Sequence, residues 1–295
     1  MSLSLVISEE NYLKSYAVFR RKTLQNELNQ QMLLSRLPQL SFKQKNIPGC
    51  QELNVLSVGT SDGVMDLLIL KLIKEELAKT DLGCNVKIFN RAIEPNASAC
   101  DLYRAAIENL PNPLNDGKTA FEICQQTFEE YQESQKKPMK FDIIHFIHSI
   151  YFNDVEKALR HCYEIELGDK GYIICIATRR DLMFKVALKQ RLQSGVYGDG
   201  THDVVEKIVE VANKNGWKYE VDHHDSSCDV TEVFDPKSTE GNRLLDFMTV
   251  TANFREMADP QLVEETLALI KDLSVVRDGK HFAEKKDSLV IIHKN

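Results

Sequence analysis

A turn with two glycines, early in the chain, has the residue types needed to hold a small ligand against its backbone. In the stretch "VLSVGTSDGVMDLLIL", Gly59 and Gly63 flank Ser61. A turn that follows a strand and opens a helix lets a ligand approach the backbone closely. The dinucleotide fingerprint requires glycine at positions 59, 61 and 64, and the phosphate-binding loop requires a Gly-Lys pair, so neither pattern matches. The turn argues against dinucleotides and nucleoside triphosphates, although so tight a turn needs glycine even without a ligand.

Two further side chains that can do chemistry stand directly after other apolar stretches. Glu94 follows "NVKIFNRAI", where a carboxylate can accept hydrogen bonds from both ribose hydroxyls of a nucleoside. His148 follows "FDIIHFI" and lies three residues after His145, so on a strand the two rings point to opposite faces and do not form a metal pair. We expect Glu94 to bind a nucleoside and His148 to face a substrate. The alternatives are an exposed charge for Glu94 and a buried ring satisfied by the backbone for His148.

The elements that must position these groups alternate between strand and helix, which predicts an α/β fold with a mostly parallel sheet covered by helices on both faces. Two late strands predict an antiparallel, hairpin-like edge. The predicted strands are 52–58, 85–93, 119–123, the first part of 141–152, 171–178, 217–224 and 288–294. The predicted helices are 64–79, 96–109, 125–135, 154–166, 181–194, 202–214, 240–250 and 260–273.

Three ranges of the chain are expected to form one compact unit. Residues 1–45 form an N-terminal helical cap, 46–180 the ligand-binding α/β core, and 181–295 the rest of the sheet with substrate-covering helices. Within the cap, residues 9–36 carry apolar side chains at helical spacing. Packing against the core and acting as a substrate lid are both open roles for this segment.

Composition narrows the classes of partner. The 295 residues are 43% apolar, which suffices for a sizeable core, and the net charge of −7 comes without a long basic block. We therefore expect a small-molecule partner, no nucleic acid and no membrane, and a monomer. Seven cysteines without a C-x-x-C motif predict reduced thiols, and the start of the chain predicts no export, so we expect a cytoplasmic protein. The ligand-rich stretch "HHDSSCD" (223–229) lacks regular zinc spacing and is interpreted as a solvated loop after a strand, so no metal site is expected.

Six segments, spread over nearly the whole chain, resemble the histamine N-methyltransferases, which are class I enzymes that use S-adenosyl-L-methionine (SAM). Class I turns have the pattern G-x-G-x-G, and Ser61 is the only replacement here. The resemblance implies the Rossmann-like class I methyltransferase fold, SAM as cofactor, S-adenosyl-L-homocysteine (SAH) as product, and methyl transfer to the amine of a small molecule. The segments are "YLKSYAVFRRKTLQNEL", "VLSVGTSDGVMDLLIL", "IEPNAS", "DIIHFIHSIYFNDVEKAL", "LLDFMTVTANF" and "SLVII".

The cofactor half of the family's site carries over well. The resemblance implies that Gly59 lines the methionine side of SAM, with Ser61 beside it, and that Glu94 holds the ribose. Ile147 falls where the family has an isoleucine near the cofactor, and Thr127 lies near the adenine-contacting position. One family contact is lost, because Ala99 replaces a glutamine.

The substrate half departs from the family. The family's substrate-binding glutamate falls on Leu28, and Glu27 reaches that position only with a shift of one residue; His148 replaces a glutamine. His148 or Glu27 would accept the proton of the amine, or desolvation by the aromatic side chains of Tyr151, Phe152 and Phe247 would lower the pKa of the amine. The acceptor is therefore left as histamine-like or another biogenic amine or amino acid. The predicted substrate-binding residues are Tyr16, Phe19, His148, Tyr151, Phe152 and Phe247.

Two other functions stay open at this stage. The chain could be a SAM-fold binding protein without catalysis, or it could methylate an oxygen or a protein side chain. Arg179 and Arg180 follow a predicted strand and could clamp a carboxylate, which would favour an amino acid as acceptor.

Overall fold

The computed structural model describes residues 9–40, 52–79, 86–134, 139–181, 185–186 and 203–294. The chain divides into two compact units, each described by itself. The helical unit comprises Met1–Leu28, Thr178–Asp203 and His223–Asp287, and the sheet unit comprises Asn29–Ala177, Val204–Asp222 and Ser288–Asn295. The units interleave the three ranges predicted from the sequence, and that division stays a prediction. Most of the predicted helix 181–194 lies outside the described residues, as do Cys50 and Cys84.

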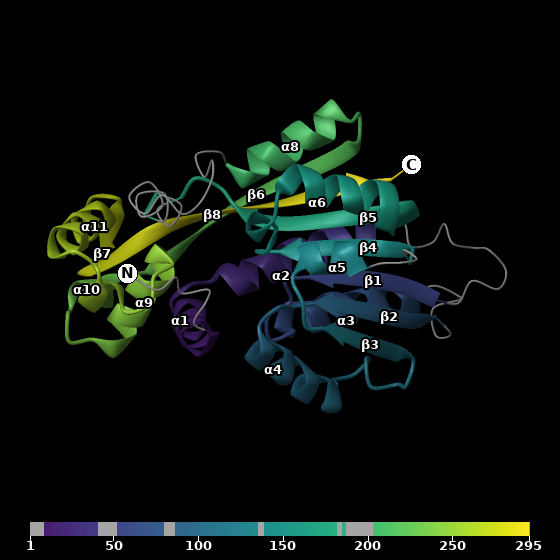
Figure 1. Ribbon diagram of the computed structural model, residues 1–295, viewed down its shortest axis with the longest axis horizontal. Coiled ribbons are helices and arrows are strands. Elements are labelled where there is room, and N and C mark those ends of the chain that lie inside the picture. Colours follow the sequence, from purple (N-terminus) through teal and green to yellow (C-terminus); the bar gives the residue numbers. More distant parts are fainter. Residues whose placement is uncertain are drawn as a thin grey trace. The chain divides into compact units, whose positions relative to one another are not determined.

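One eight-stranded sheet contains the described strands, in the order β3-β2-β1-β4-β5-β8-β6, with β7 paired to β8 (Figure 1). The pairs β3–β2, β2–β1, β1–β4 and β4–β5 are parallel. Backbone hydrogen bonds join Lys294 to Gly171 and Arg179 to Lys286, so β8 runs antiparallel to β5. The strands are β1 Glu52–Val58, β2 Lys87–Ile93, β3 Thr119–Cys124, β4 Phe141–Ile147, β5 Leu167–Thr178, β6 Lys218–Asp229, β7 Ser274–Arg277 and β8 Lys280–His293.

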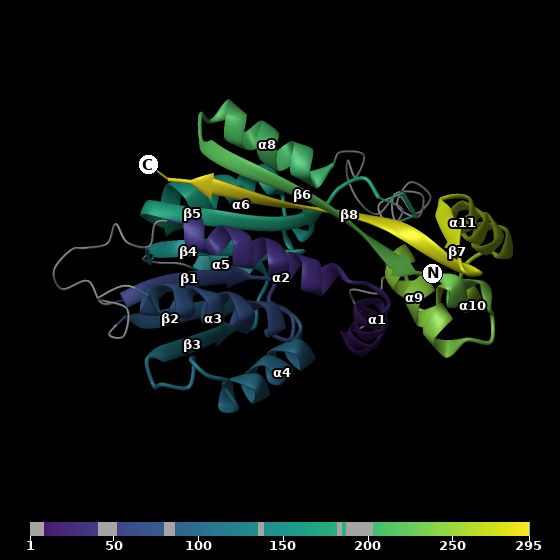
Figure 2. The same cartoon turned by 180° about the vertical axis from the view of Figure 1, so that it is seen from behind.

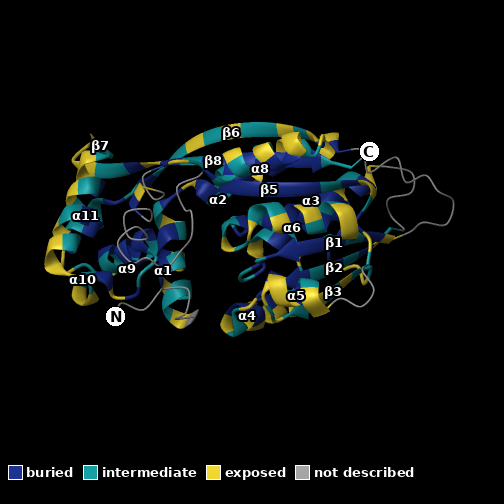
Figure 3. Cartoon of the chain, turned by 45° about the horizontal axis from the view of Figure 1, so that its top comes forward, coloured by how far each residue is buried: buried dark blue, intermediate teal, exposed yellow. Residues whose placement is uncertain are grey.

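Helices cover both faces of the sheet because the central strands are apolar on both sides. One core contains Leu56, Phe146 and side chains of α5, α6 and α8. The other contains Val55, Ile143 and side chains of α2 and α3. Figures 1 and 2 show these two layers from opposite sides, and Figure 3 shows the central strands as buried. The helices are α2 Gln25–Arg36, α3 Val64–Ala78, α4 Ala97–Glu108, α5 Phe128–Ser134, α6 Val155–His161 and α8 Val204–Lys214.

The helical unit has its own apolar core, to which Phe19, Leu244 and Met248 belong. In it α1 packs against α9, and the hairpin of β7 and β8 lies beside α11 (Figure 2). Its helices are α1 Glu9–Lys22, α9 Thr239–Thr249, α10 Phe254–Met257 and α11 Pro260–Asp272. Short helical turns occur at Leu37–Gln39, Ile150–Phe152 and Thr231–Phe234, and a π-helix at Cys162–Glu166 extends α6.

The α/β fold class and the strand-helix alternation are confirmed, and three details differ. The stretch 223–229 is not a loop but the second half of β6, because an edge strand needs only one partner and tolerates polar side chains. The last strand starts at Lys280 instead of at residue 288. Together with β6 it forms the end of the sheet, and its antiparallel pairing with β5 agrees with the predicted antiparallel edge. His148 does not lie on a strand, because β4 ends at Ile147 and His148 has a positive φ of 55°.

None of the described helices is long and apolar enough to cross a membrane. The cytoplasmic location and the monomeric state stay predictions. Cys100, Cys162, Cys175 and Cys228 are buried free thiols, and Cys124 is a half-buried one.

Candidate functional site

The glycine turn after β1 has a left-handed backbone that larger residues tolerate poorly. Gly59 has φ 70° and Gly63 φ 77°, and Ser61 between them has φ 50°. The Gly59 N–H donates to the Ile93 carbonyl over 2.8 Å, which ties the turn to the end of β2. A Cβ on Gly59 would lie 2.3 Å from Cβ of Ser149. Glycine is therefore required at position 59 both by conformation and by space.

Glu94 is attached to this turn through its carboxylate. The side chain is only 8% exposed. One carboxylate oxygen accepts the Ser61 N–H at 2.8 Å and the other accepts the Asn96 N–H at 2.9 Å. Each carboxylate oxygen has a second lone pair, so both can also accept a ligand hydroxyl. Glu94 thus shapes the turn and retains the capacity to bind a ribose.

The turn also holds two buried hydroxyls, on Thr60 and Ser61, that have no hydrogen-bond partner among the described residues. Buried polar atoms of folded proteins are almost always hydrogen-bonded, so orphaned hydroxyls at a backbone turn indicate a polar ligand. Together with Glu94 they fit a nucleoside carrying an amino-acid chain.

Two other predicted cofactor residues lie at neighbouring strand ends. Ile147 ends β4, is partly buried and packs against the core on the α2 and α3 face. Thr127 caps α5: its hydroxyl accepts the Glu130 N–H, and the Glu130 carboxylate accepts the Thr127 N–H at 2.8 Å. This reciprocal pair is a capping box, which explains a threonine here without any ligand. The roles of both residues in cofactor binding stay predictions.

His148 is fixed in orientation by three contacts within the sheet unit. Its N–H donates to the Ile176 carbonyl over 2.8 Å, which supports the positive φ. The ring Nε2 lies 2.9 Å from the Asn29 side-chain nitrogen, and Nδ1 lies 2.8 Å from the Tyr151 hydroxyl. The Asn29 amide donates to Nε2, so the neutral ring donates from Nδ1 to Tyr151. A strained backbone at a strand end with an oriented imidazole is typical of a functional position.

The comparisons with known proteins agree with a site for a nucleoside that carries an amino-acid chain. No family model matches the chain. Histamine N-methyltransferase A of Xenopus laevis is 24% identical over 293 residues, which cover 98% of this chain and 97% of that protein. Carnosine N-methyltransferase 2 of Gallus gallus is 23% identical over 250 residues, covering 84% and 75%. Among solved structures, loganic acid methyltransferase with SAH has a TM-score of 0.53 at 10% identity, covering 90% of this chain and 92% of that one. The fold is that of a class I methyltransferase.

The resemblance to the histamine N-methyltransferases, predicted from six segments, is confirmed by a match along nearly the whole chain. In a class I methyltransferase fold, the carboxyl ends of β1, β2 and β4 meet at one edge of the sheet, where ligands of open α/β sheets bind. The turn, Glu94 and His148 all stand at this edge. Their common location could be predicted from the alternation of elements, because each follows a strand.

The predicted aromatic residues divide between the two units. Tyr16, Phe19 and Phe247 form one cluster in the helical unit, with ring centroids of Phe19 and Phe247 4.6 Å apart. Tyr12, which was not a predicted site residue, stacks on Tyr16 at 6.1 Å. Tyr151 and Phe152 lie beside His148 in the sheet unit, with centroids 5.6 Å apart, and Phe152 is 58% exposed. Their roles in substrate binding stay predictions.

The inward face of α2 carries polar residues that the sequence analysis missed. Glu27 is exposed, whereas Gln25 and Asn29 are buried on the same helix. Asn29 contacts His148, and its side-chain oxygen is buried without a partner among the described residues. The spacing in the sequence could have revealed that Gln25 and Asn29 face inward, since positions 25, 29, 33 and 37 are four apart and lie on one face.

A buried charged cluster occupies the helical unit where β5 ends. Lys285 is 3% exposed and lies 3.1 Å from both Asp181 and Asp287, with Thr178 also in contact. Burial disfavours the ammonium, but the two carboxylates raise the pKa of Lys285 above its usual value. Arg179, a candidate clamp for a substrate carboxylate, already pairs with Asp225 at 2.6 Å.

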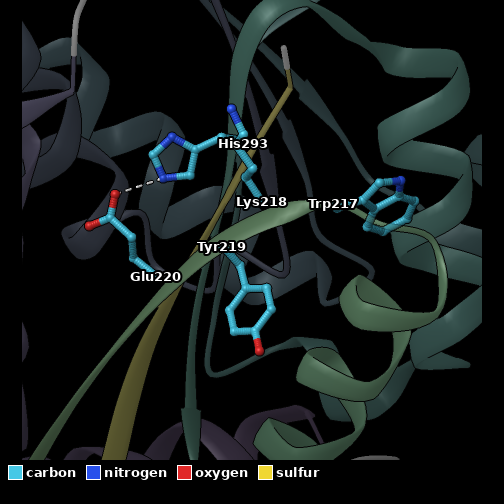
Figure 4. A pocket seen from close by; sticks show the side chains of 5 residues that line it. All are labelled: Trp217, Lys218, Tyr219, Glu220 and His293. Carbon is cyan, nitrogen blue, oxygen red and sulfur yellow. Dashed lines mark ion pairs between the residues drawn. The ribbon is translucent and has the colours of Figure 1, made fainter.

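A shallow depression lies at the start of β6 and the end of β8, in the sheet unit (Figure 4). In it His293 pairs with Glu220 at 3.0 Å, and Trp217, Lys218 and Tyr219 complete the lining. The start of β6 lies at the opposite end of the strands from the glycine turn, because β1, β4 and β5 have their carboxyl ends on the side of that turn. This depression is therefore separate from the glycine turn and Glu94, where we expect the cofactor to bind.

Proposed function

We propose that the protein is a SAM-dependent methyltransferase that acts on the amine nitrogen of a small molecule, histamine-like or another biogenic amine or amino acid. The observation that carries the cofactor is the Glu94 carboxylate, hydrogen-bonded to the backbone of a left-handed glycine turn with orphaned hydroxyls on Thr60 and Ser61. The relatives named as N-methyltransferases support an amine as acceptor.

When bound, SAM supplies a methyl group on a sulfonium, which a neutral nitrogen can attack in line. The Glu94 carboxylate would hold the ribose, and Gly59 would let the methionine part approach the backbone. Good positioning of two reactants contributes about 7–11 kcal/mol to a rate enhancement. No covalent intermediate with the protein is needed, so the residues of this site bind, orient and exclude water.

The amine must lose a proton in the reaction, and His148 is the group that we assign to it. The neutral ring can take up a proton at Nε2, the nitrogen that faces Asn29, because Asn29 can serve both charge states. With neutral His148 the Asn29 nitrogen donates to Nε2; after rotation of the amide, the orphaned Asn29 oxygen accepts from the protonated ring. Glu27 is less suited, because it is exposed on α2.

The identity of the acceptor is tested by a screen of amines with isotope-labelled SAM and mass-spectrometric detection. We expect label transfer to at least one primary or imidazole amine and heat of binding with SAH in titration calorimetry. Binding of SAH without turnover on any amine would support a binding protein instead. Absence of SAH binding would overturn the whole proposal.

A further inference from the structure

Beneath the glycine turn lies a cluster of fully buried polar side chains that the proposed reaction does not use. It joins five elements of the sheet unit, and each member is at most 2% exposed. The members are Ser57 on β1, Asp66 on α3, Asn90 on β2, Tyr103 on α4 and His145 on β4.

Hydrogen bonds connect these side chains in series. The Ser57 hydroxyl donates to the Asn90 side-chain oxygen at 2.8 Å and contacts His145 Nε2 at 2.7 Å. The Asn90 amide donates to the Tyr103 hydroxyl at 3.1 Å. The Asp66 carboxyl interacts electrostatically with Tyr103, Ser57 and Asn90, and its Oδ2 atom is buried without a hydrogen-bond partner among the described residues.

The cluster reaches the turn through Tyr103. A Cβ on Gly63 would lie 2.1 Å from an atom of the Tyr103 ring, so the ring is packed directly against the turn backbone. Asp66 itself stands three residues further on, in the first turn of α3. Asp66 therefore belongs both to the cluster that contains the ring under Gly63 and to the first turn of the helix that the glycine turn opens.

We propose that Asp66 is a positioning residue for the cofactor turn, and that it acts as a neutral carboxylic acid which holds Tyr103 beneath Gly63. This inference rests on the proposed SAM-binding function. A carboxyl whose Oδ2 has no hydrogen-bond donor is poorly suited to carry a negative charge, and as a neutral acid it needs no counter-ion among Ser, Asn and Tyr side chains.

The surroundings of Asp66 favour the protonated form. Burial raises the pKa of Asp66 to about 8, partly opposed by the polar groups of Ser57, Tyr103 and Asn90, and the charge of Glu94 raises it further. His145, whose Nε2 lies 3.8 Å from the carboxyl, supplies no positive charge, because burial lowers its pKa to about 3. Burial likewise raises the pKa of Tyr103 well above its usual value, so the phenol stays neutral.

Ionisation of Asp66 would place a second negative charge near Glu94 and disturb the ring under the turn. If only the neutral form binds, the dissociation constant of SAH rises by up to about tenfold between about pH 7 and about pH 9. Asp66→Asn cannot ionise, and its amide can replace the neutral acid as donor and acceptor.

The test is titration calorimetry with SAH from about pH 6 to about pH 9, on the full chain, for wild type, Asp66→Asn and the control Asp142→Asn. Asp142 is another buried carboxylate of the sheet unit, which accepts the Asn54 N–H far from the turn. We expect Asp66→Asn to match wild type near neutral pH and to lose its alkaline weakening, and Asp142→Asn to keep it. Tyr103→Phe, which keeps the ring but removes the hydroxyl, should weaken SAH binding at all pH values.

Two results would overturn this inference alone: equal pH dependence in wild type and Asp66→Asn, or a loss of more than about tenfold in Asp66→Asn near neutral pH while thermal unfolding stays cooperative. A wild-type protein that binds no SAH at any pH would overturn the proposed function, and with it this inference.

Discussion

Replacing Glu94 with glutamine should abolish cofactor binding almost as fully as replacing it with alanine. An isosteric change usually preserves one acceptor and costs little. Here both carboxylate oxygens already accept backbone N–H groups, from Ser61 and Asn96. A glutamine must therefore turn its NH2 group against one of these N–H groups, and the turn loses the geometry that both bonds maintain.

The magnitude follows from the bonds lost. Hydrogen bonds to a charged group contribute about 1.5–3 kcal/mol each. Loss of two bonds to the ribose hydroxyls removes about 3–6 kcal/mol, which corresponds to a weakening of at least about 100-fold. Titration calorimetry with SAH measures this directly for Glu94→Gln and Glu94→Ala.

The matched control is Glu122→Gln on the neighbouring strand β3, where the carboxylate is partly exposed and pairs with Arg91 at 2.7 Å. This variant should bind SAH like wild type. If Glu94→Gln stays within about threefold of wild type while remaining folded by circular dichroism, Glu94 does not hold the ribose and the assignment of the turn is wrong.

Three further changes probe the rest of the site and the fold. Gly59→Ala should weaken SAH binding by more than about tenfold, because its Cβ would meet Ser149 at 2.3 Å on a backbone of positive φ; unchanged affinity in calorimetry would contradict the predicted close approach. His148→Gln should lower kcat by about 100-fold or more with SAH affinity unchanged, because an amide keeps two contacts but takes up no proton; initial rates with the best amine of the screen decide it, and an unchanged kcat would exclude His148 as proton acceptor. Lys285→Met should lower the free energy of unfolding by about 3–5 kcal/mol, since two buried carboxylates lose their cation. The control Lys286→Met, which removes a partly exposed pair with Glu284, should lower it by about 0.5 kcal/mol or less, and equal denaturation midpoints of the two variants would contradict this.

The parts of the fold that follow from local sequence were predictable. Strand β1 spans Glu52–Val58 as its apolar run predicts, and α4 starts after the Asn96 cap, whose side chain accepts the Ala99 N–H. Both features depend on neighbours in the sequence, so periodicity and capping suffice. The second half of β6 could not be found in this way. Its polar residues become a strand only because β8, far along the chain, offers a paired edge.

The same distinction between local sequence and long-range packing explains which parts of the site could be predicted. The turn and Glu94 are one strand apart in the fold, and the rule that ligands bind beyond the carboxyl ends of parallel strands places them together. No local rule connects Asn29 with His148, or Asp66 with Tyr103, because these pairs belong to elements whose packing is decided by the cores on both sheet faces. Buried polar pairs of this kind are visible in a sequence only as polar residues at apolar positions.

His148 contacts Asn29 through one ring nitrogen and Tyr151 through the other. The resemblance to the histamine N-methyltransferases places a family glutamine at this position, and a glutamine amide can also face Asn29 on one side and Tyr151 on the other. The histidine makes these two contacts, at 2.9 and 2.8 Å, and unlike an amide it can take up a proton. The orphaned oxygen of Asn29 provides the acceptor that a protonated ring requires. If His148 is the proton acceptor that we propose, the pair gives the amine proton a defined destination, which a glutamine at this position would not provide.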